Sequence, residues 1–111
     1  MQKLLIADSS DIFASALESA LTGQFQIVTC ADGDTLLELL HTYRPDVLIL
    51  NLMLPYKDGL TVLQESAYQP PLIIANTMHV NAYVERSIVA LGIDYVMISP
   101  SVSAVVLRLQ D

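Results

Sequence analysis

Short apolar runs alternate along the chain with segments whose apolar residues recur at helical spacing. Glycine or proline lies at most of the boundaries between them, as at Gly23, Pro45 and Gly92. The runs of strand length cover residues 3–7, 25–29, 47–50, 72–75 and 95–98. The expected helices cover residues 13–21, 33–42, 59–67, 81–91 and 102–109. Strand and helix are therefore predicted to alternate five times.

Alternation with short connections predicts an α/β fold, because neighbouring parallel strands need crossover connections. We expect a flavodoxin-like, doubly wound three-layer sandwich with five parallel strands and helices on both faces. The continuous apolar run at 47–50 is typical of a strand that is covered on both sides. The 111 residues suit one domain, 1–111. Its last helix looks short or truncated, so we expect the N-terminal part of a longer chain.

Composition and charge narrow the class of partner. Apolar residues make up 53% of the chain and the net charge is -7, with five scattered basic residues. Direct contact with nucleic acid needs a basic patch, so this domain is not expected to bind it. No signal peptide or long apolar span is visible, and Cys30 is the single cysteine. A cytoplasmic protein with no membrane contact is the resulting expectation.

Small polar residues follow four of the expected strands. In an open parallel sheet, ligands bind outside the carboxyl ends of the strands. We therefore expect these residues to meet in one shallow pocket, with Asp8 as its single charged member. They are Asp8 and Ser9, then Asn51, then Asn76 and Thr77, and finally Ser99 and Pro100.

The segment from Pro45 to Gly59, PDVLILNLMLPYKDG, resembles the phosphoacceptor segment of the receiver (CheY-like) domains of two-component response regulators. Residues 3–8 are similar to the first strand of that family with its acidic end, and residues 92–100 to its last strand. The resemblance covers essentially the whole chain. It implies a regulatory role in phosphorelay signal transduction, most often over a transcriptional output domain.

The sequence departs from the family where the chemistry would occur. The phosphoacceptor aspartate is replaced by Asn51, whose neutral amide cannot attack phosphorus as a carboxylate does. The second metal-binding acid falls at Ser9, the lysine at Ser99, and the switch hydroxyl at Asn76 with Thr77 beside it. We therefore predict a degenerate pseudo-receiver. Its vestigial phosphoacceptor pocket comprises Asp8, Ser9, Asn51, Asn76, Thr77 and Ser99.

These replacements predict a protein that is not an enzyme and has no catalytic residues. Asp8 is the one candidate metal ligand left, so we expect no cofactor and weak or absent magnesium binding. The competing hypothesis is a residual phosphoryl-transfer or hydrolase activity centred on Asp8. The expected pocket lacks the general base and the lysine that such an activity would need.

The leading hypothesis is phosphorylation-independent regulation of an output domain, by dimerisation or partner binding. The alternative is a stand-alone protein-binding adaptor. In the receiver family the fourth helix, fifth strand and fifth helix often form the interface, and this region is rich in apolar residues here. The expected contact residues are Tyr83, Val84, Ile88, Val89, Tyr95, Val105, Val106 and Leu109. A longer last helix would instead cover part of this surface.

Overall fold

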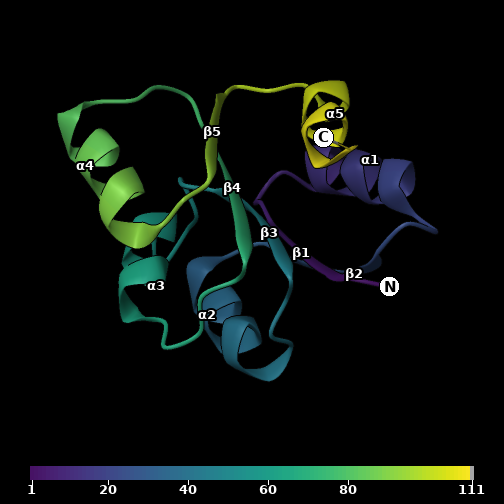
Figure 1. Cartoon of the computed structure of the whole chain (residues 1–111), viewed down its shortest axis with the longest axis horizontal. Coiled ribbons are helices and arrows are strands. Elements are labelled where there is room, and N and C mark those ends of the chain that lie inside the picture. Colours follow the sequence, from purple (N-terminus) through teal and green to yellow (C-terminus); the bar gives the residue numbers. More distant parts are fainter. Residues whose placement is uncertain (111) are drawn as a thin grey trace.

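The computed structural model describes residues 1–110 and has one sheet of five parallel strands in the order β2-β1-β3-β4-β5. Each strand is followed by a helix, so the chain alternates as its pattern predicts (Figure 1). The strands are β1 (Lys3–Ala7), β2 (Gln26–Cys30), β3 (Val47–Asn51), β4 (Leu72–Thr77) and β5 (Tyr95–Ile98). The helices are α1 (Asp11–Leu21), α2 (Gly33–Thr42), α3 (Gly59–Glu65), α4 (Ala82–Leu91) and α5 (Val102–Gln110).

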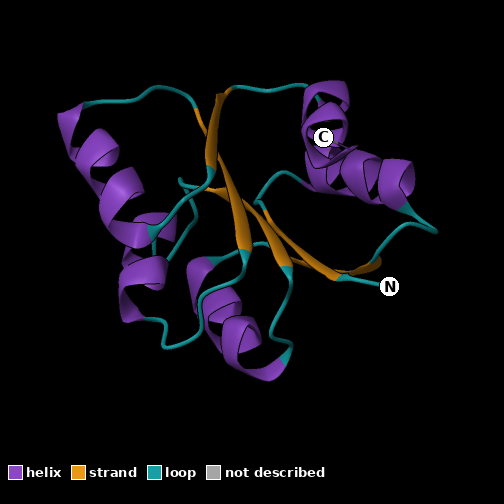
Figure 2. Ribbon diagram, viewed as in Figure 1, coloured by secondary structure: helices purple, strands orange, loops and turns teal. Residues whose placement is uncertain are grey.

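The helices cover both faces of the sheet. α1 and α5 lie together on one face, and α2, α3 and α4 lie on the other (Figure 2). Alternate residues of the central strands supply the two cores: Leu4 and Ile6 pack on the α1–α5 side, Leu5 and Leu48 on the α2–α3 side. Strands buried on both faces explain the continuous apolar runs. The flavodoxin-like prediction is confirmed.

All five helices begin with a side chain that caps the first turn. The side-chain oxygen of each cap accepts a hydrogen bond from the backbone N–H three residues later, which satisfies one of the free amides of a helix start. The caps are Ser10, Asp32, Asp58, Asn81 and Ser101, which precede α1, α2, α3, α4 and α5 in that order. The caps therefore fix where each strand-to-helix loop ends.

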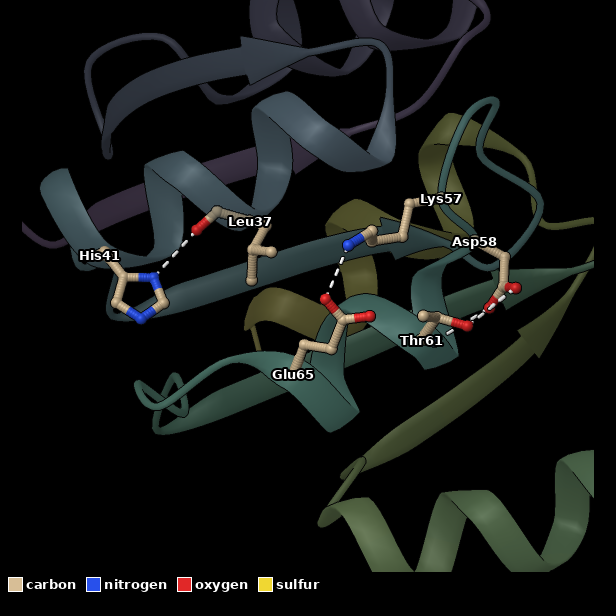
Figure 3. A network of polar contacts seen from close by, with 6 residues as sticks. All are labelled: Leu37, His41, Lys57, Asp58, Thr61 and Glu65. Carbon is tan, nitrogen blue, oxygen red and sulfur yellow. Dashed lines mark hydrogen bonds and ion pairs between the residues drawn. The ribbon is translucent and has the colours of Figure 1, made fainter.

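The loop between β3 and α3 is held against α2. The Gly33 N–H donates to the Pro55 carbonyl at 3.1 Å, and a Cβ added at Gly33 would lie 1.7 Å from the Lys57 carbonyl oxygen. The Lys57 ammonium pairs with the Glu65 carboxylate at 2.6 Å, and the Asp58 carboxylate caps α3 by accepting from the Thr61 N–H (Figure 3). The loop that follows Asn51 is therefore held by α2 and by the first turns of α3.

Several boundaries differ from the expectation by one or two residues, among them the ends of α3 and β4. α3 ends at Glu65, because the Ser66 N–H still bonds to the Val62 carbonyl while Ser66 itself turns extended. β4 continues through Asn76 and Thr77, since Asn76 pairs in register with Asn51 and Thr77 with Ile98. Both residues expected in a loop therefore belong to the sheet. None of the helices in residues 1–110 is long and apolar enough to cross a membrane.

Candidate functional site

A cavity of about 220 Å³ opens at the carboxyl edge of the sheet. Its wall comes from the ends of β1, β3, β4 and β5 and from the first turn of α1. The lining residues are Asp8, Ser10, Phe13, Asn51, Asn76, Thr77, Met78, Ser99 and Pro100. Five of the six residues predicted for the pocket are therefore brought together.

Asp8 follows β1 directly and is buried, with 7% of its surface exposed. Its Oδ1 accepts a hydrogen bond from the Ser10 N–H at 2.9 Å, and its Oδ2 faces the Asn51 Nδ2 at 3.4 Å. The Asp8 N–H donates to the Cys30 carbonyl at 3.0 Å. The carboxylate is thus held in a fixed orientation by its own loop and by the neighbouring strand.

Asn51 ends β3 and is oriented by two contacts. Its Oδ1 accepts from the Met53 N–H at 2.8 Å, and its Nδ2 donates to Asp8 Oδ2. Since the Met53 N–H can only donate, the amide oxygen must face it, and the NH2 group is left pointing at Asp8. The Asn51 side chain therefore gives the Asp8 carboxylate a hydrogen-bond donor.

Asn76 and Thr77 end β4 beside Asn51. Both are buried, and the Thr77 hydroxyl donates to the His79 carbonyl at 3.1 Å. Within the described residues 1–110, the buried side-chain nitrogen and oxygen of Asn76 have no hydrogen-bond partner. Nothing in the sequence signals this, because it depends on where neighbouring donors point.

Ser99 lies on the far side of the cavity. Its N–H donates to the Thr77 carbonyl at 2.8 Å, and its backbone adopts a left-handed φ of 43°. This conformation is uncommon for a residue with a Cβ and is found in tight turns and functional loops. Ser99 and Pro100 thus close the wall opposite Asp8.

Ser9 was predicted in the pocket, and this is wrong. Ser9 is exposed and outside the lining, whereas Ser10 contributes to it and caps α1. The Asp8 carboxylate accepts from the Ser10 N–H, so the chain turns at Ser9 and brings the next serine to the wall. Asp11 begins α1, exposed and also outside the lining.

The residues at this edge do not fit a divalent metal ion. Within residues 1–110 there is no group of three or more His, Cys, Asp or Glu side chains that could hold one. Among these residues, Asp8 is the single carboxylate of the lining, and the Asn51 oxygen already accepts from Met53. Magnesium prefers several hard oxygen ligands in octahedral array, which this set does not offer.

Cys30 carries a nucleophilic side chain at the end of β2, and it is buried in the core. Burial, with a smaller contribution from Asp32, raises the pKa of the thiol to about 12. The thiol therefore stays protonated at neutral pH and acts as a small apolar group.

Part of the predicted interaction surface is wrong. Val105 is fully buried, because it points from α5 into the core that α1 and the sheet share. Val84 and Ile88 are half-buried against the opposite core, and Val106 and Leu109 pack beside Val105. Tyr83, Val89 and Tyr95 are exposed as expected. Sequence reasoning missed two exposed apolar residues, Ile98 at 61% and Leu107 at 64%.

Comparison with known proteins places this fold in a family. The response regulator receiver domain model matches residues 4–105, so the chain belongs to that family and is a two-component signalling domain. The probable transcriptional regulatory protein TcrX of Mycobacterium tuberculosis is 32% identical, over 96% of this chain and 47% of that protein. The probable transcriptional regulator ycf27 of Guillardia theta is 42% identical, over 58% of this chain and 26% of that protein. The chain spans about half the length of these curated relatives, or less.

Solved structures show the same fold. A CheY-like receiver domain protein from Methanospirillum hungatei superposes with a TM-score of 0.87 at 14% identity, covering 99% of this chain and 91% of that one. The chemotaxis protein CheY4 of Vibrio cholerae gives 0.83 at 22% identity, covering 99% and 97%. The predicted receiver fold is confirmed, while the loss of phosphorylation remains a prediction.

Proposed function

We propose that this receiver domain regulates a partner or an output domain without being phosphorylated. The observation that carries the proposal is the state of Asn51 at the phosphoacceptor position. Its carboxamide lies between the Met53 N–H and the Asp8 carboxylate, with its NH2 group directed at Asp8. A neutral amide in this arrangement offers no anionic oxygen to attack phosphorus.

The rest of the cavity supports the same proposal. Of the described residues, no Lys, Arg or His side chain lines it to neutralise a phosphoryl group, and the position of the family's lysine is Ser99. Asp8 would also repel an incoming phosphate. The Asp8–Asn51 contact gives the carboxylate a hydrogen-bond donor without a metal ion. We therefore propose that the domain needs no magnesium and performs no phosphoryl transfer.

The surface around β5 is the proposed contact region. β5 is an edge strand, and exposed apolar side chains lie on it and on both adjacent helices. A patch of this kind often marks an interface. The exposed members are Tyr83 and Val89 on α4, Tyr95 and Ile98 on β5, and Leu107 on α5. We name this set the β5 surface and propose that it mediates dimerisation or partner binding.

The proposed output is transcriptional, because the curated relatives are named as transcriptional regulators. The second candidate, a stand-alone adaptor, uses the same β5 surface with a separate protein. Expression of the native gene product and its intact mass would separate the two, since an output domain adds mass beyond this domain.

The proposal is tested by incubating the chain with phosphoramidate and magnesium and measuring the intact mass. We expect no added phosphoryl mass. The matched positive control is the double variant Asn51→Asp with Ser99→Lys, which restores a carboxylate and an ammonium at two cavity positions. A stable adduct on the unmodified chain that persists in Asn51→Ala would show that another residue accepts phosphate, and the proposal would be wrong.

A further inference from the structure

The cavity holds a negative charge that nothing in its described lining balances. Asp8 is buried, and its two side-chain contacts come from a backbone N–H at 2.9 Å and from a side-chain amide at 3.4 Å. The remaining lining residues are neutral. Both hydrogen-bond donors to Asp8 are neutral, and a buried carboxylate without an opposite charge is costly, so this cavity favours a positively charged occupant.

A second feature also calls for an occupant. Asn76 is 5% exposed, lines the cavity, and within residues 1–110 has neither its amide oxygen nor its amide nitrogen hydrogen-bonded. Asn76 is the register partner of Asn51, which is itself in contact with Asp8. Buried polar groups in proteins almost always have partners, so a ligand that donates to Asn76 Oδ1 would satisfy one of these two groups.

Three side-chain oxygens that can accept a further hydrogen bond select the kind of cation. Asp8 Oδ2, Asn76 Oδ1 and the Thr77 hydroxyl oxygen can each accept, and they come from the ends of β1 and β4 on either side of Asn51. A primary ammonium group carries one positive charge, three N–H donors and no acceptor. Phe13, Met78 and Pro100 add apolar wall, against which methylene groups can pack.

Other ligand classes fit less well. An anion would meet the Asp8 carboxylate with no basic side chain in the described lining to offset it. A divalent ion would lack the anionic oxygens that it prefers. The volume of about 220 Å³ exceeds the roughly 30 Å³ that one water takes in the liquid, so an ammonium group with several methylenes has room.

We propose that this cavity binds a primary ammonium group on a short alkyl chain, with Asp8 as its charge partner and Asn76 as an acceptor. The group is supplied either by a free alkylamine or by a lysine side chain of a protein partner. The inference rests on the proposed function, because a cavity that never holds a phosphoryl group is free to hold this one. Its occupation would then be the signal that replaces phosphorylation.

The test is a titration of the 111-residue chain with n-butylammonium chloride at constant ionic strength, followed by amide chemical shifts. We expect saturable shifts at Asp8, Asn51, Asn76 and Ser99. Tetramethylammonium has the charge without N–H donors, and 1-butanol has the chain without the charge, so neither should reproduce these shifts. Absence of saturable shifts, or equal shifts with tetramethylammonium, would overturn the proposal.

Two variants locate the binding. Asp8→Asn should weaken the affinity at least about tenfold, as loss of a charge-assisted hydrogen bond does. Asp11→Asn removes the same charge from the first turn of α1, outside the cavity, and should leave the affinity unchanged. Asn76→Ala is the second cavity variant and should also weaken binding. Unchanged affinity in a folded Asp8→Asn or Asn76→Ala protein would contradict the assignment.

The source of the ammonium is distinguished with Nα-acetyl-lysine N-methylamide. Binding as tight as that of butylammonium indicates a lysine of a protein partner, whereas exclusion of this larger probe indicates a free amine. The two proposals fail separately. Phosphorylation of the chain would be seen by intact mass whatever the amine does, and a failed amine titration leaves the mass result unchanged.

Discussion

At position 51, the side-chain amide both accepts and donates a hydrogen bond, whereas an ionised carboxylate could only accept. Asn51 Oδ1 accepts from the Met53 N–H, as either side chain could, but only the amide can also donate to Asp8. The exchange of an oxygen for an NH2 group turns a repulsive pair into an attractive one. The residue that we propose in place of the phosphoacceptor therefore also donates to the acid beside it.

A carboxylate at position 51 should destabilise the domain. Asn51→Asp places two acids about as close as the present contact of 3.4 Å, and removes the donor to Asp8. We expect the free energy of unfolding at neutral pH to fall by about 1–3 kcal/mol. Urea unfolding measures this directly. Asn51→Ala, which loses both bonds without adding charge, is the control.

The pH dependence of that loss has a definite sign. In the Asn51→Asp variant, repulsion between the new carboxylate and Asp8 raises the pKa of one of the two acids above its value in the unfolded chain. The folded variant then binds more protons than the unfolded chain as the pH falls, so its deficit relative to the native chain shrinks toward acid pH. The deficit of Asn51→Ala should not follow this course. A pH-independent deficit in Asn51→Asp would show that the two acids do not interact.

Among the elements, the contact of α2 with the β3–α3 loop decides how the site is held. Gly33 begins α2 and lies under the backbone of Lys57, where the loop that leaves Asn51 turns toward α3. In most helices alanine is preferred to glycine by about 1 kcal/mol. Here the loop occupies the space that a Cβ would need, so the ordinary preference is reversed.

Gly33→Ala is therefore expected to destabilise the domain by about 3 kcal/mol, the upper end of the usual cost of overpacking, since backbone rather than a flexible side chain must move. Thermal or urea unfolding would measure the loss. Gly23→Ala is the matched control: its φ of 90° strains an alanine by about 1–2 kcal/mol, but no atom lies within 4 Å of the added Cβ. Equal losses of unfolding free energy in the two variants would mean that the β3–α3 loop can move away from position 33 at little cost.

The elements were predictable from sequence because burial on both faces gives the strands unbroken apolar runs, as at Leu4 to Ala7. The convergence of Asp8, Asn51 and Asn76 followed from the topology alone. What could not be predicted depends on one dihedral or one contact. One example is the turn after Asp8, which places Ser10 rather than Ser9 at the cavity wall. The inward direction of Val105 and the unpaired amide of Asn76 are two others.

On the scale of the whole molecule, the β5 surface collects exposed apolar side chains from β5 and from α4 and α5. It crosses from one helical layer to the other over the edge of the sheet, between α4 and α5 (Figure 1). The Arg108 guanidinium lies 4.4 Å from the centre of the Tyr95 ring, which ties α5 to this edge. The proposed surface would therefore draw on all three layers.

Charges placed on this surface should prevent association. We expect Ile98→Lys and Leu107→Lys each to weaken self-association, or partner binding, at least about tenfold, because each would bury an unpaired charge at an interface. Light scattering after size-exclusion chromatography measures the oligomer. Ile12→Lys, at an exposed isoleucine on α1, is the control. Association that survives both β5 variants and fails in the control would place the interface on α1.

The sheet order also bears on how the chain acquires its structure. β1 pairs with β2 on one side and β3 on the other, so Lys3 meets Gln26 and Leu4 meets Val47. Every ladder of this sheet is parallel, so each pairing must wait for a crossover helix. During synthesis, β1 leaves the ribosome before the other four strands and keeps one edge unpaired until β3 emerges. Folding of this domain is thus a late event in its own translation, and chaperones that shield apolar strands would act in that interval.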